Sequence, residues 1–384
     1  MLPRIGRPVT RLTRPIVIIS PTTARRSLQT ETLPSTSIPI IRGIEAIRKW
    51  RAGRTSTVGL VPTMGALHEG HLSLIRAAAR ESRDVVVSVF LNPAQFGAGE
   101  DLASYPVTWE GDAAALARID GQELASPSSS SSSSLSPTDG HQGGRIRAIF
   151  APDISTMYPE GAPGPYPDSK GSFVSITPLG EVLEGASRPT FFRGVATVCM
   201  KLFNLVQPDV VFLGQKDVQQ TVVLRRMVRD LMLPIRIAVC PTARDEDGLA
   251  LSSRNVYLGP RRRAVAVRLL PAALKAASAA YDRSLEREDI LGAAHEVVAR
   301  LAAEQGALSP EERVRFEVDY VSLADPDTLL EVDAVDPLRG AVLSAAVRML
   351  PLEKVRDGEE VGYANGPLVR LIDNIILKPR KVAG

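Results

Sequence analysis

The sequence contains little cysteine, few aromatic residues and no long apolar run. Cysteine occurs only at Cys199 and Cys240, and one possible disulfide cannot stabilise a chain of 384 residues, so a reducing compartment is expected. Uninterrupted apolar runs such as residues 15–19 are far shorter than the roughly 20 residues that a membrane-spanning helix needs. These absences argue against a disulfide-rich secreted domain and against an integral membrane protein.

Acidic residues are absent before Glu31, whereas six arginines and many hydroxyl residues lie in the same stretch. This Arg-rich, acid-free composition is typical of a mitochondrial transit peptide. We therefore interpret residues 1–36 as a disordered extension that directs the protein to the mitochondrion. The alternative is a cytoplasmic protein whose extension carries no targeting signal.

The net charge of +3 comes from this opening, because the chain without those six arginines has 40 basic and 43 acidic residues. Such a balance gives no reason to expect a nucleic-acid partner. Apolar residues make up 44% of the chain and charged residues 23%, as is ordinary for a globular protein. A chain of this length is expected to form two compact domains.

Strand-like and helix-like patterns alternate through the first of these domains, which we place at residues 37–242. The expected strands are 57–61, 84–91, 209–213 and 235–239, and the expected helices are 72–80, 194–206 and 218–231. Strands as continuously apolar as 84–91 are typical of a parallel sheet that is covered on both faces. The pattern predicts an α/β fold, a Rossmann-like doubly wound parallel sheet, with its site outside the carboxyl ends of the strands.

Two features depart from this alternation. A Ser-rich segment at residues 121–144 cannot bury enough apolar surface to offset its ordering entropy, so we predict a disordered surface insertion. After residue 242 the chain becomes rich in Ala and Arg, with helices expected at 264–281 and 290–304 and a strand at 315–321. Residues 243–384 are therefore expected to form a smaller α+β domain.

The segment 62–71, P-T-M-G-A-L-H-E-G-H, lies where the first strand gives way to a helix. The unpaired N–H groups and positive dipole end of that helix favour an anion. His68 and His71 share one face of its first turn. A zinc hydrolase would need i, i+4 spacing and a third ligand. One capping and one surface histidine is a second alternative, and contact with phosphate is the interpretation that we favour.

A second group, Ser252, Ser253, Arg254 and Asn255, follows the last strand of the first domain. Hydroxyl donors beside a guanidinium suit a pyrophosphate. The alternative is an ordinary turn between domains.

Together these segments resemble known sequence signatures. The H-x-G-H of the first segment resembles the nucleotidylyl-transferase superfamily, in which the histidines contact the triphosphate and a basic loop closes from the opposite side. Four further segments make the chain similar to the pantothenate synthetase family, the pantoate–β-alanine ligases: F-L-N-P-A-Q-F at 90–96, L-E-G-A-S-R-P-T-F-F-R-G-V at 183–195, G-Q-K-D-V-Q-Q at 214–220 and R-L-I-D-N at 370–374. The similarity covers nearly the whole chain from about Ile38 onward, apart from the Ser-rich segment and a polar insertion near residues 352–367.

The resemblance implies ATP-dependent condensation of pantoate with β-alanine through a pantoyl adenylate, with Mg²⁺ on the phosphates, no metal-binding side chains, and a homodimer. The implied catalytic residues are His68, His71, Lys216, Ser252, Ser253 and Arg254. The nucleotide would also contact Pro62, Thr63, Met64, Gly65, Gly214 and Asp217. The implied pantoate contacts are Met64, Asn92, Gln95, Tyr105, Arg188 and Gln220, with a scaffold ion pair as the alternative for Arg188.

Some positions depart from the family pattern. Phe191 stands where many relatives have histidine, and Gln215 stands where glutamate is common. Another nucleotidylyl transferase and a catalytically silent nucleotide-binding protein remain as rival functions.

Overall fold

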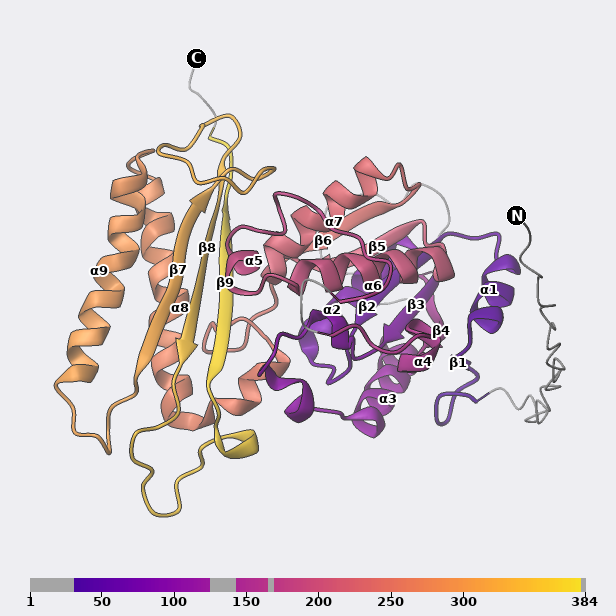
Figure 1. The fold of residues 1–384 in the computed structure, drawn as a ribbon, viewed down its shortest axis with the longest axis horizontal. Helices are drawn as coiled ribbons and strands as arrows, with labels where there is room; N and C mark the ends of the chain where they lie inside the picture. Colours follow the sequence, from indigo (N-terminus) through magenta and orange to yellow (C-terminus); the bar gives the residue numbers. More distant parts are fainter. Residues whose placement is uncertain (1–30, 125–142, 165–168, 381–384) are drawn as a thin grey trace, which may run out of the picture. The chain divides into compact units, whose positions relative to one another are not determined.

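The computed structural model describes residues 31–124, 143–164 and 169–380. The targeting prediction for the first thirty residues and most of the Ser-rich insertion lie outside these ranges. A six-stranded parallel sheet has the order β1-β4-β3-β2-β5-β6 (Figure 1). Its strands are β1 (Ile40–Ile41), β2 (Val58–Thr63), β3 (Asp84–Val89), β4 (Arg145–Phe150), β5 (Val210–Gly214) and β6 (Arg236–Cys240).

Helices cover both faces of this sheet, as predicted for a doubly wound fold. Helices α1 (Ile44–Ala52), α6 (Phe191–Val206) and α7 (Val218–Asp230) pack on one face, and α2 (Glu69–Glu81) and α3 (Trp109–Arg118) pack on the other. The valines of strand β3 show why its sequence is almost continuously apolar. Val86 enters the first core, whereas Val85 and Val87 enter the second, because successive side chains of a strand point to opposite faces.

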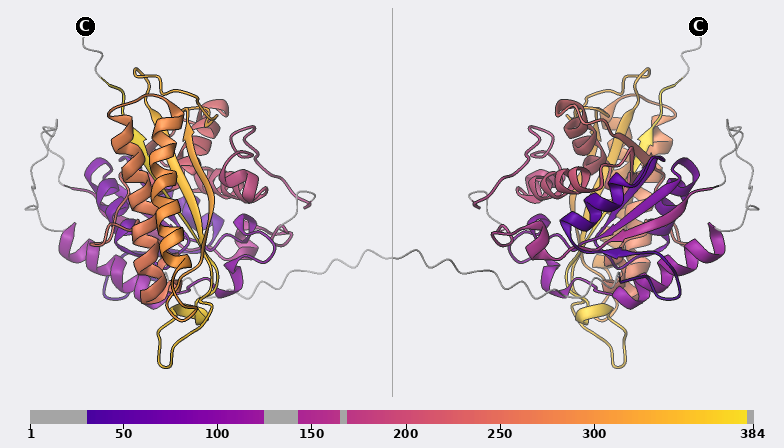
Figure 2. Two further views of the ribbon diagram at one scale, coloured as in Figure 1. Left: turned by 90° about the vertical axis from the view of Figure 1, so that its left-hand side faces the viewer. Right: turned by 90° about the vertical axis from the view of Figure 1, so that its right-hand side faces the viewer.

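The C-terminal part contains the three-stranded antiparallel sheet β7 (Phe316–Ala324), β8 (Ala341–Met349) and β9 (Val369–Leu377). The long helices α8 (Gly259–Tyr281) and α9 (Arg287–Gly306) lie side by side across one face of it (Figure 2). Among the described helices, α8 alone is long and apolar enough to cross a membrane by length and composition. Its apolar side chains, such as Leu269 and Leu270, lie in the core shared with α9 and the small sheet.

Short helical segments complete the described chain. They are η1 (Pro93–Gln95), η2 (Asp101–Ser104), η3 (Ile119–Glu123), α4 (Ile154–Met157), α5 (Glu184–Ser187), η4 (Gln215–Asp217), η5 (Ser253–Tyr257) and η6 (Tyr363–Asn365).

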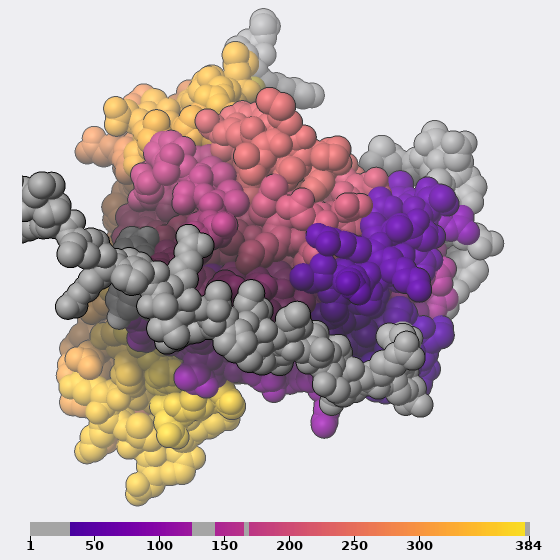
Figure 3. Space-filling view, turned by 45° about the vertical axis from the view of Figure 1, so that its right-hand side comes forward, coloured from indigo at the N-terminus to yellow at the C-terminus, as the bar shows by residue number. Residues whose placement is uncertain are grey.

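In Figure 3 the indigo start of the described chain and the yellow C-terminal residues lie on opposite sides of the visible face. A small apolar cluster joins the two sheets, with Val222 and Val223 of α7 against Val342 of β8. Residues 31–384 group as one compact unit, so the domain boundary near residue 242 stays a prediction.

Two predicted boundaries are wrong at their edges. Residues 31–36 were expected to be disordered, but Leu33 is fully buried in the core and its N–H donates to the Ile38 carbonyl. Residues 121–123 were expected to belong to the insertion, but they complete η3, where the Glu123 carboxylate pairs with Arg76 at 2.6 Å. In both places a few buried or ion-paired side chains order a polar segment.

Candidate functional site

The loop between β2 and α2 is shaped by a carboxylate that the sequence analysis missed. Buried Asp112 of α3 accepts hydrogen bonds from the backbone N–H groups of Ala66 and Leu67, at 2.9 and 2.8 Å. Gly65 has φ +88°, and a Cβ there would lie 3.1 Å from the Asp112 carboxylate. Glycine therefore permits both the turn and the close approach. No local motif marks Asp112, because its partners lie about 45 residues earlier in the chain.

The two histidines lie at the start of α2, as the sequence predicted. His68 is the N-cap, and its Nδ1 accepts from the Gly70 N–H at 3.1 Å. Nδ1 of His71 accepts from the His68 N–H at 3.3 Å, and the two ring centroids are 4.1 Å apart. Because both Nδ1 atoms act as acceptors, the proton of each neutral imidazole resides on Nε2.

Burial and a nearby lysine keep these rings neutral. Burial lowers the pKa of His68 to about 4, with a further lowering by Lys216. Burial, the neighbouring His68 and Lys216 lower the pKa of His71 to about 3. At neutral pH the pair therefore offers two N–H donors without carrying positive charge.

Lys216 lies at the carboxyl end of β5, in η4. Because β5 pairs with β2 in the sheet, this end lies beside the histidine loop. Its side chain is 18% exposed, and its Nζ is 3.6 Å from the Asp217 carboxylate. The lysine supplies the positive charge that the two neutral imidazoles lack.

The Ser-Ser-Arg segment lies against the histidine loop, as the interpretation as a phosphate site requires. The Ser253 hydroxyl donates to the Ala66 carbonyl at 3.1 Å. Ser252 is the N-cap of η5 and accepts from the Arg254 N–H at 3.3 Å. Both Nε and Nη2 of Arg254 donate to the Asp101 carboxylate at 2.8 Å. Segments about 185 residues apart in the chain thus form one polar surface.

A cavity of about 230 Å³ brings together the residues that were expected to hold pantoate. Its lining includes the amides of Gln95 and Gln220 and the apolar side chains Pro62, Met64 and Phe90. Thr63, Asn92, Tyr105 and Arg188 also line it, together with both histidines.

The amide of Asn92 is occupied by the protein itself. Asn92 is 1% exposed, and its Nδ2 donates to the Gln95 Oε1 at 3.0 Å. Its Oδ1 accepts from the Tyr158 hydroxyl at 2.6 Å. This geometry lets Asn92 orient Gln95, whereas the sequence analysis expected Asn92 to contact pantoate directly.

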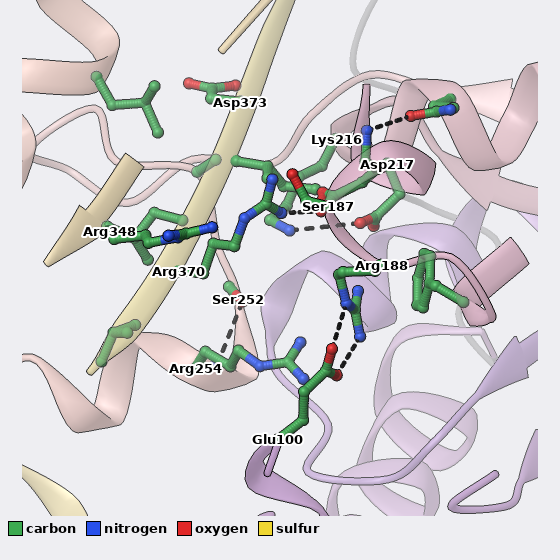
Figure 4. Close-up of a pocket in the computed structure, with 18 of the residues that line it drawn as sticks. Glu100, Ser187, Arg188, Lys216, Asp217, Ser252, Arg254, Arg348, Arg370 and Asp373 are labelled. Atoms are coloured by element: carbon green, nitrogen blue, oxygen red, sulfur yellow. Dashed lines mark hydrogen bonds and ion pairs between the residues drawn. The ribbon is translucent and has the colours of Figure 1, made fainter. Parts of the chain in front are cut away.

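A second cavity, of about 560 Å³, extends toward the small sheet (Figure 4). Lys216, Asp217, Gln220, Ser252 and Arg254 line both cavities. Its lining also includes Arg348 of β8 and Arg370 and Asp373 of β9, which the sequence did not predict as site residues. These residues lie more than 90 positions beyond the Ser-Ser-Arg segment, and only the docking of the small sheet brings them to the site.

Arg188 lines both cavities and is also part of an ion pair. Its Nε donates to the Glu100 carboxylate at 2.7 Å. Its guanidinium carbon lies 3.8 Å from the ring centroid of Phe191. The two alternatives considered for Arg188 are therefore compatible. Phe191 packs on this arginine by a cation–π contact.

Comparison with known proteins gives matches over the described fold. Residues 39–376 match the family described as pantoate-beta-alanine ligase. A pantothenate synthetase of Roseiflexus castenholzii is 41% identical over 339 residues, which is 88% of this chain and 99% of that protein. The pantoate–beta-alanine ligase of Saccharomyces cerevisiae is 37% identical over 352 residues, with coverage of 88% and 99%.

Two solved structures are also similar to this chain. A pantothenate synthetase from Thermus thermophilus has a TM-score of 0.67 and 37% sequence identity, covering 88% of this chain and 99% of its own. A pantoate-beta-alanine ligase from Francisella tularensis, complexed with β-γ ATP and β-alanine, has a TM-score of 0.59 and 25% identity, covering 88% and 98%.

Proposed function

Because this chain belongs to the pantoate-beta-alanine ligase family, we propose that it condenses pantoate with β-alanine, using ATP and releasing pyrophosphate and AMP. The pantoate carboxylate attacks the α-phosphate of ATP, which forms the pantoyl adenylate and expels pyrophosphate. The β-alanine amine then attacks the acyl carbon. A C–N bond forms, the acyl–phosphate C–O bond breaks, and AMP leaves as the nitrogen loses a proton.

One observation carries the proposal: donors from three distant segments converge on the smaller cavity, which shares Lys216, Ser252 and Arg254 with the larger one. His68 and His71 supply N–H groups, Lys216 supplies charge, and the Ser252–Arg254 turn closes the other side. A carboxylate is already ionised at neutral pH, so the reaction requires no enzyme nucleophile. The protein instead aligns two anions and stabilises the charge on the leaving pyrophosphate.

We assign pantoate to the smaller cavity. Gln95 and Gln220 can hydrogen-bond its hydroxyl groups, and Met64 and Phe90 can cover its geminal methyl groups. An acid without those hydroxyls would leave the amides unpaired, at a cost of roughly 1–3 kcal/mol each.

Magnesium would neutralise charge on the phosphates of bound ATP. The described residues contain no group of three or more His, Cys, Asp or Glu side chains placed to hold a metal ion. In this proposal the ion is coordinated mainly by phosphate oxygens and water.

The test of the function is a reconstitution assay with purified protein and Mg²⁺. AMP should appear only when ATP, pantoate and β-alanine are all present. ATP and pantoate without β-alanine should support exchange of labelled pyrophosphate into ATP. Release of a dinucleotide product would favour another nucleotidylyl transferase, and ATP binding without turnover would favour a silent binding protein.

Two further properties belong to this proposal. The protein is a homodimer, which light scattering of the purified chain tests directly. The Arg-rich part of the predicted extension, residues 1–30, directs it to the mitochondrion, and the family match, which begins at residue 39, leaves this part outside the shared fold. Imaging a fluorescent fusion with and without residues 1–30, which keeps the buried Leu33 in place, distinguishes mitochondrial targeting from a cytoplasmic location.

A further inference from the structure

Asn374 of β9 belongs to the small sheet, yet its side chain is bonded to the segment that carries Lys216. Asn374 is 1% exposed. Its Nδ2 donates to the carbonyls of Gln215 and Lys216, both at 2.9 Å. Its Oδ1 accepts from the Gln215 Nε2 at 3.2 Å. Both N–H groups of this amide are therefore used on η4.

The two carbonyls that accept from Asn374 belong to consecutive peptide groups. The Gln215 carbonyl lies in the peptide before the Lys216 Cα, and the Lys216 carbonyl lies in the peptide after it. Holding both planes restricts φ and ψ of Lys216, since these are the only soft backbone torsions between them. The direction in which the lysine side chain leaves the backbone is fixed in consequence.

The backbone of Asn374 is itself held within the small sheet. Asn374 pairs with Ser344 in the β8–β9 ladder, and its N–H donates to the Asp373 carboxylate at 2.8 Å. That carboxylate accepts two hydrogen bonds from Arg244, at 2.6 and 2.9 Å. Aspartate at position 374 would lack the two donors and would place negative charge against two carbonyls.

We infer that Asn374 is a positioning residue for Lys216, through which the small sheet sets the place of the lysine ammonium during adenylate formation. The inference rests on the proposed function. It differs from a purely structural role, in which Asn374 would only hold the two sheets together. Misplacement of a charged group by about 1 Å is enough to reduce a rate by roughly 100-fold.

The test is a pair of comparisons of pantoate-dependent pyrophosphate exchange, one in the wild-type background and one in Lys216→Ala. Asn374→Asp and Asn374→Ala should lower the exchange rate by roughly 10- to 100-fold when Lys216 is present. In the Lys216→Ala background they should cause no further loss, because residues that act as one unit are non-additive. A purely structural role predicts the same loss in both backgrounds and would overturn the inference.

Two controls separate this outcome from unfolding. Gln215→Ala removes the bond to Oδ1 without altering the small sheet, and it should give a smaller loss with the same dependence on Lys216. Val222→Ala trims the apolar cluster that α7 shares with Val342 of the small sheet, outside the lining of both cavities, and should leave exchange within twofold of wild type. If wild-type protein shows no exchange, the proposed function fails. If wild type exchanges and the Asn374 variants match it, only the inference fails.

Discussion

Among individual residues, the imidazoles and Lys216 have complementary parts in the proposed reaction. Both rings are held neutral, with Nε2–H free to donate, while the lysine carries the charge. A protonated imidazole beside the lysine would repel it in a poorly solvated site, whereas neutral donors add hydrogen bonds without that penalty. The site thus combines the charge of Lys216 with neutral donors held at the start of a helix.

Removing the charge of Lys216 should affect chemistry more than folding. We expect Lys216→Ala to retain the fold and to lower the rate of adenylate formation by on the order of two to four powers of ten, the range for loss of a contact that stabilises developing charge. Pyrophosphate exchange measures this rate. Lys275→Ala, at an exposed position of α8, is the matched control and should leave the rate unchanged. A near-normal rate for Lys216→Ala would remove this lysine from the site.

The smaller cavity predicts a selective effect of Gln95. We expect Gln95→Ala to raise the KM for pantoate by roughly 10-fold or more, as loss of a hydrogen bond in a desolvated pocket costs about 1–3 kcal/mol. The KM for ATP should change much less, because Gln95 is not among the residues proposed to contact the nucleotide. Steady-state kinetics with each substrate varied in turn provides the comparison. Equal changes in both constants would contradict the assignment of Gln95 to pantoate.

For the secondary-structure elements, the segment between β8 and β9 shows how a polar stretch becomes ordered. Arg262 of α8 is fully buried, and its Nη1 donates to the Pro367 carbonyl at 2.6 Å. Its Nε donates to the Leu258 carbonyl at 2.9 Å, and Nη2 bonds to the Tyr257 carbonyl. One guanidinium therefore joins the start of α8 to the polar insertion that the sequence analysis placed near residues 352–367.

Loss of this guanidinium should destabilise the C-terminal part. We expect Arg262→Met to lower the free energy of unfolding by about 3 kcal/mol, because several buried carbonyls lose their donor at once. Denaturant titration measures the change. Arg263→Met is the adjacent control: Arg263 makes partly exposed ion pairs with Asp245 and Asp247, so its loss should cost within about 1 kcal/mol. Similar losses for the two variants would show that burial of Arg262 is not decisive.

At the scale of the whole molecule, the buried histidines predict how stability depends on pH. In the unfolded chain they titrate near pH 6.5, and in the folded protein their pKa values are lowered to about 4 and about 3. Between pH 6.5 and 4.5 the unfolded state therefore binds protons that the folded state does not, and stability falls as the pH falls. Each histidine contributes a slope approaching roughly 1.4 kcal/mol per pH unit.

Unfolding free energies measured across that pH window, without nucleotide, test this prediction. His71→Asn removes one of the two groups and should make the fall with decreasing pH shallower. A slope that is unchanged in this variant would mean that His71 is not buried in its neutral form.

The sequence alone determined the elements whose patterns are local. It predicted the apolar run of β3, the glycine-containing turn before α2 and the helix spacing of α6 and α7, because each of these depends on neighbouring residues. Strands β8 and β9 were missed, as were α1 and α3. Motif resemblance supplied the family and most of the candidate site, including His68, Lys216 and the Ser252–Arg254 turn.

Only the tertiary structure decided how those residues are held. Asp112 accepts hydrogen bonds from the histidine loop, Asn92 donates a hydrogen bond to Gln95, and Asn374 donates to the backbone carbonyls on either side of the Lys216 Cα. The contacts of Asp112 and Asn374 join separate elements that lie far apart in the chain, so their geometry depends on how those elements pack. Local patterns record which side chains can donate or accept, but the partner is chosen by the fold, because a hydrogen bond forms only within about 3 Å.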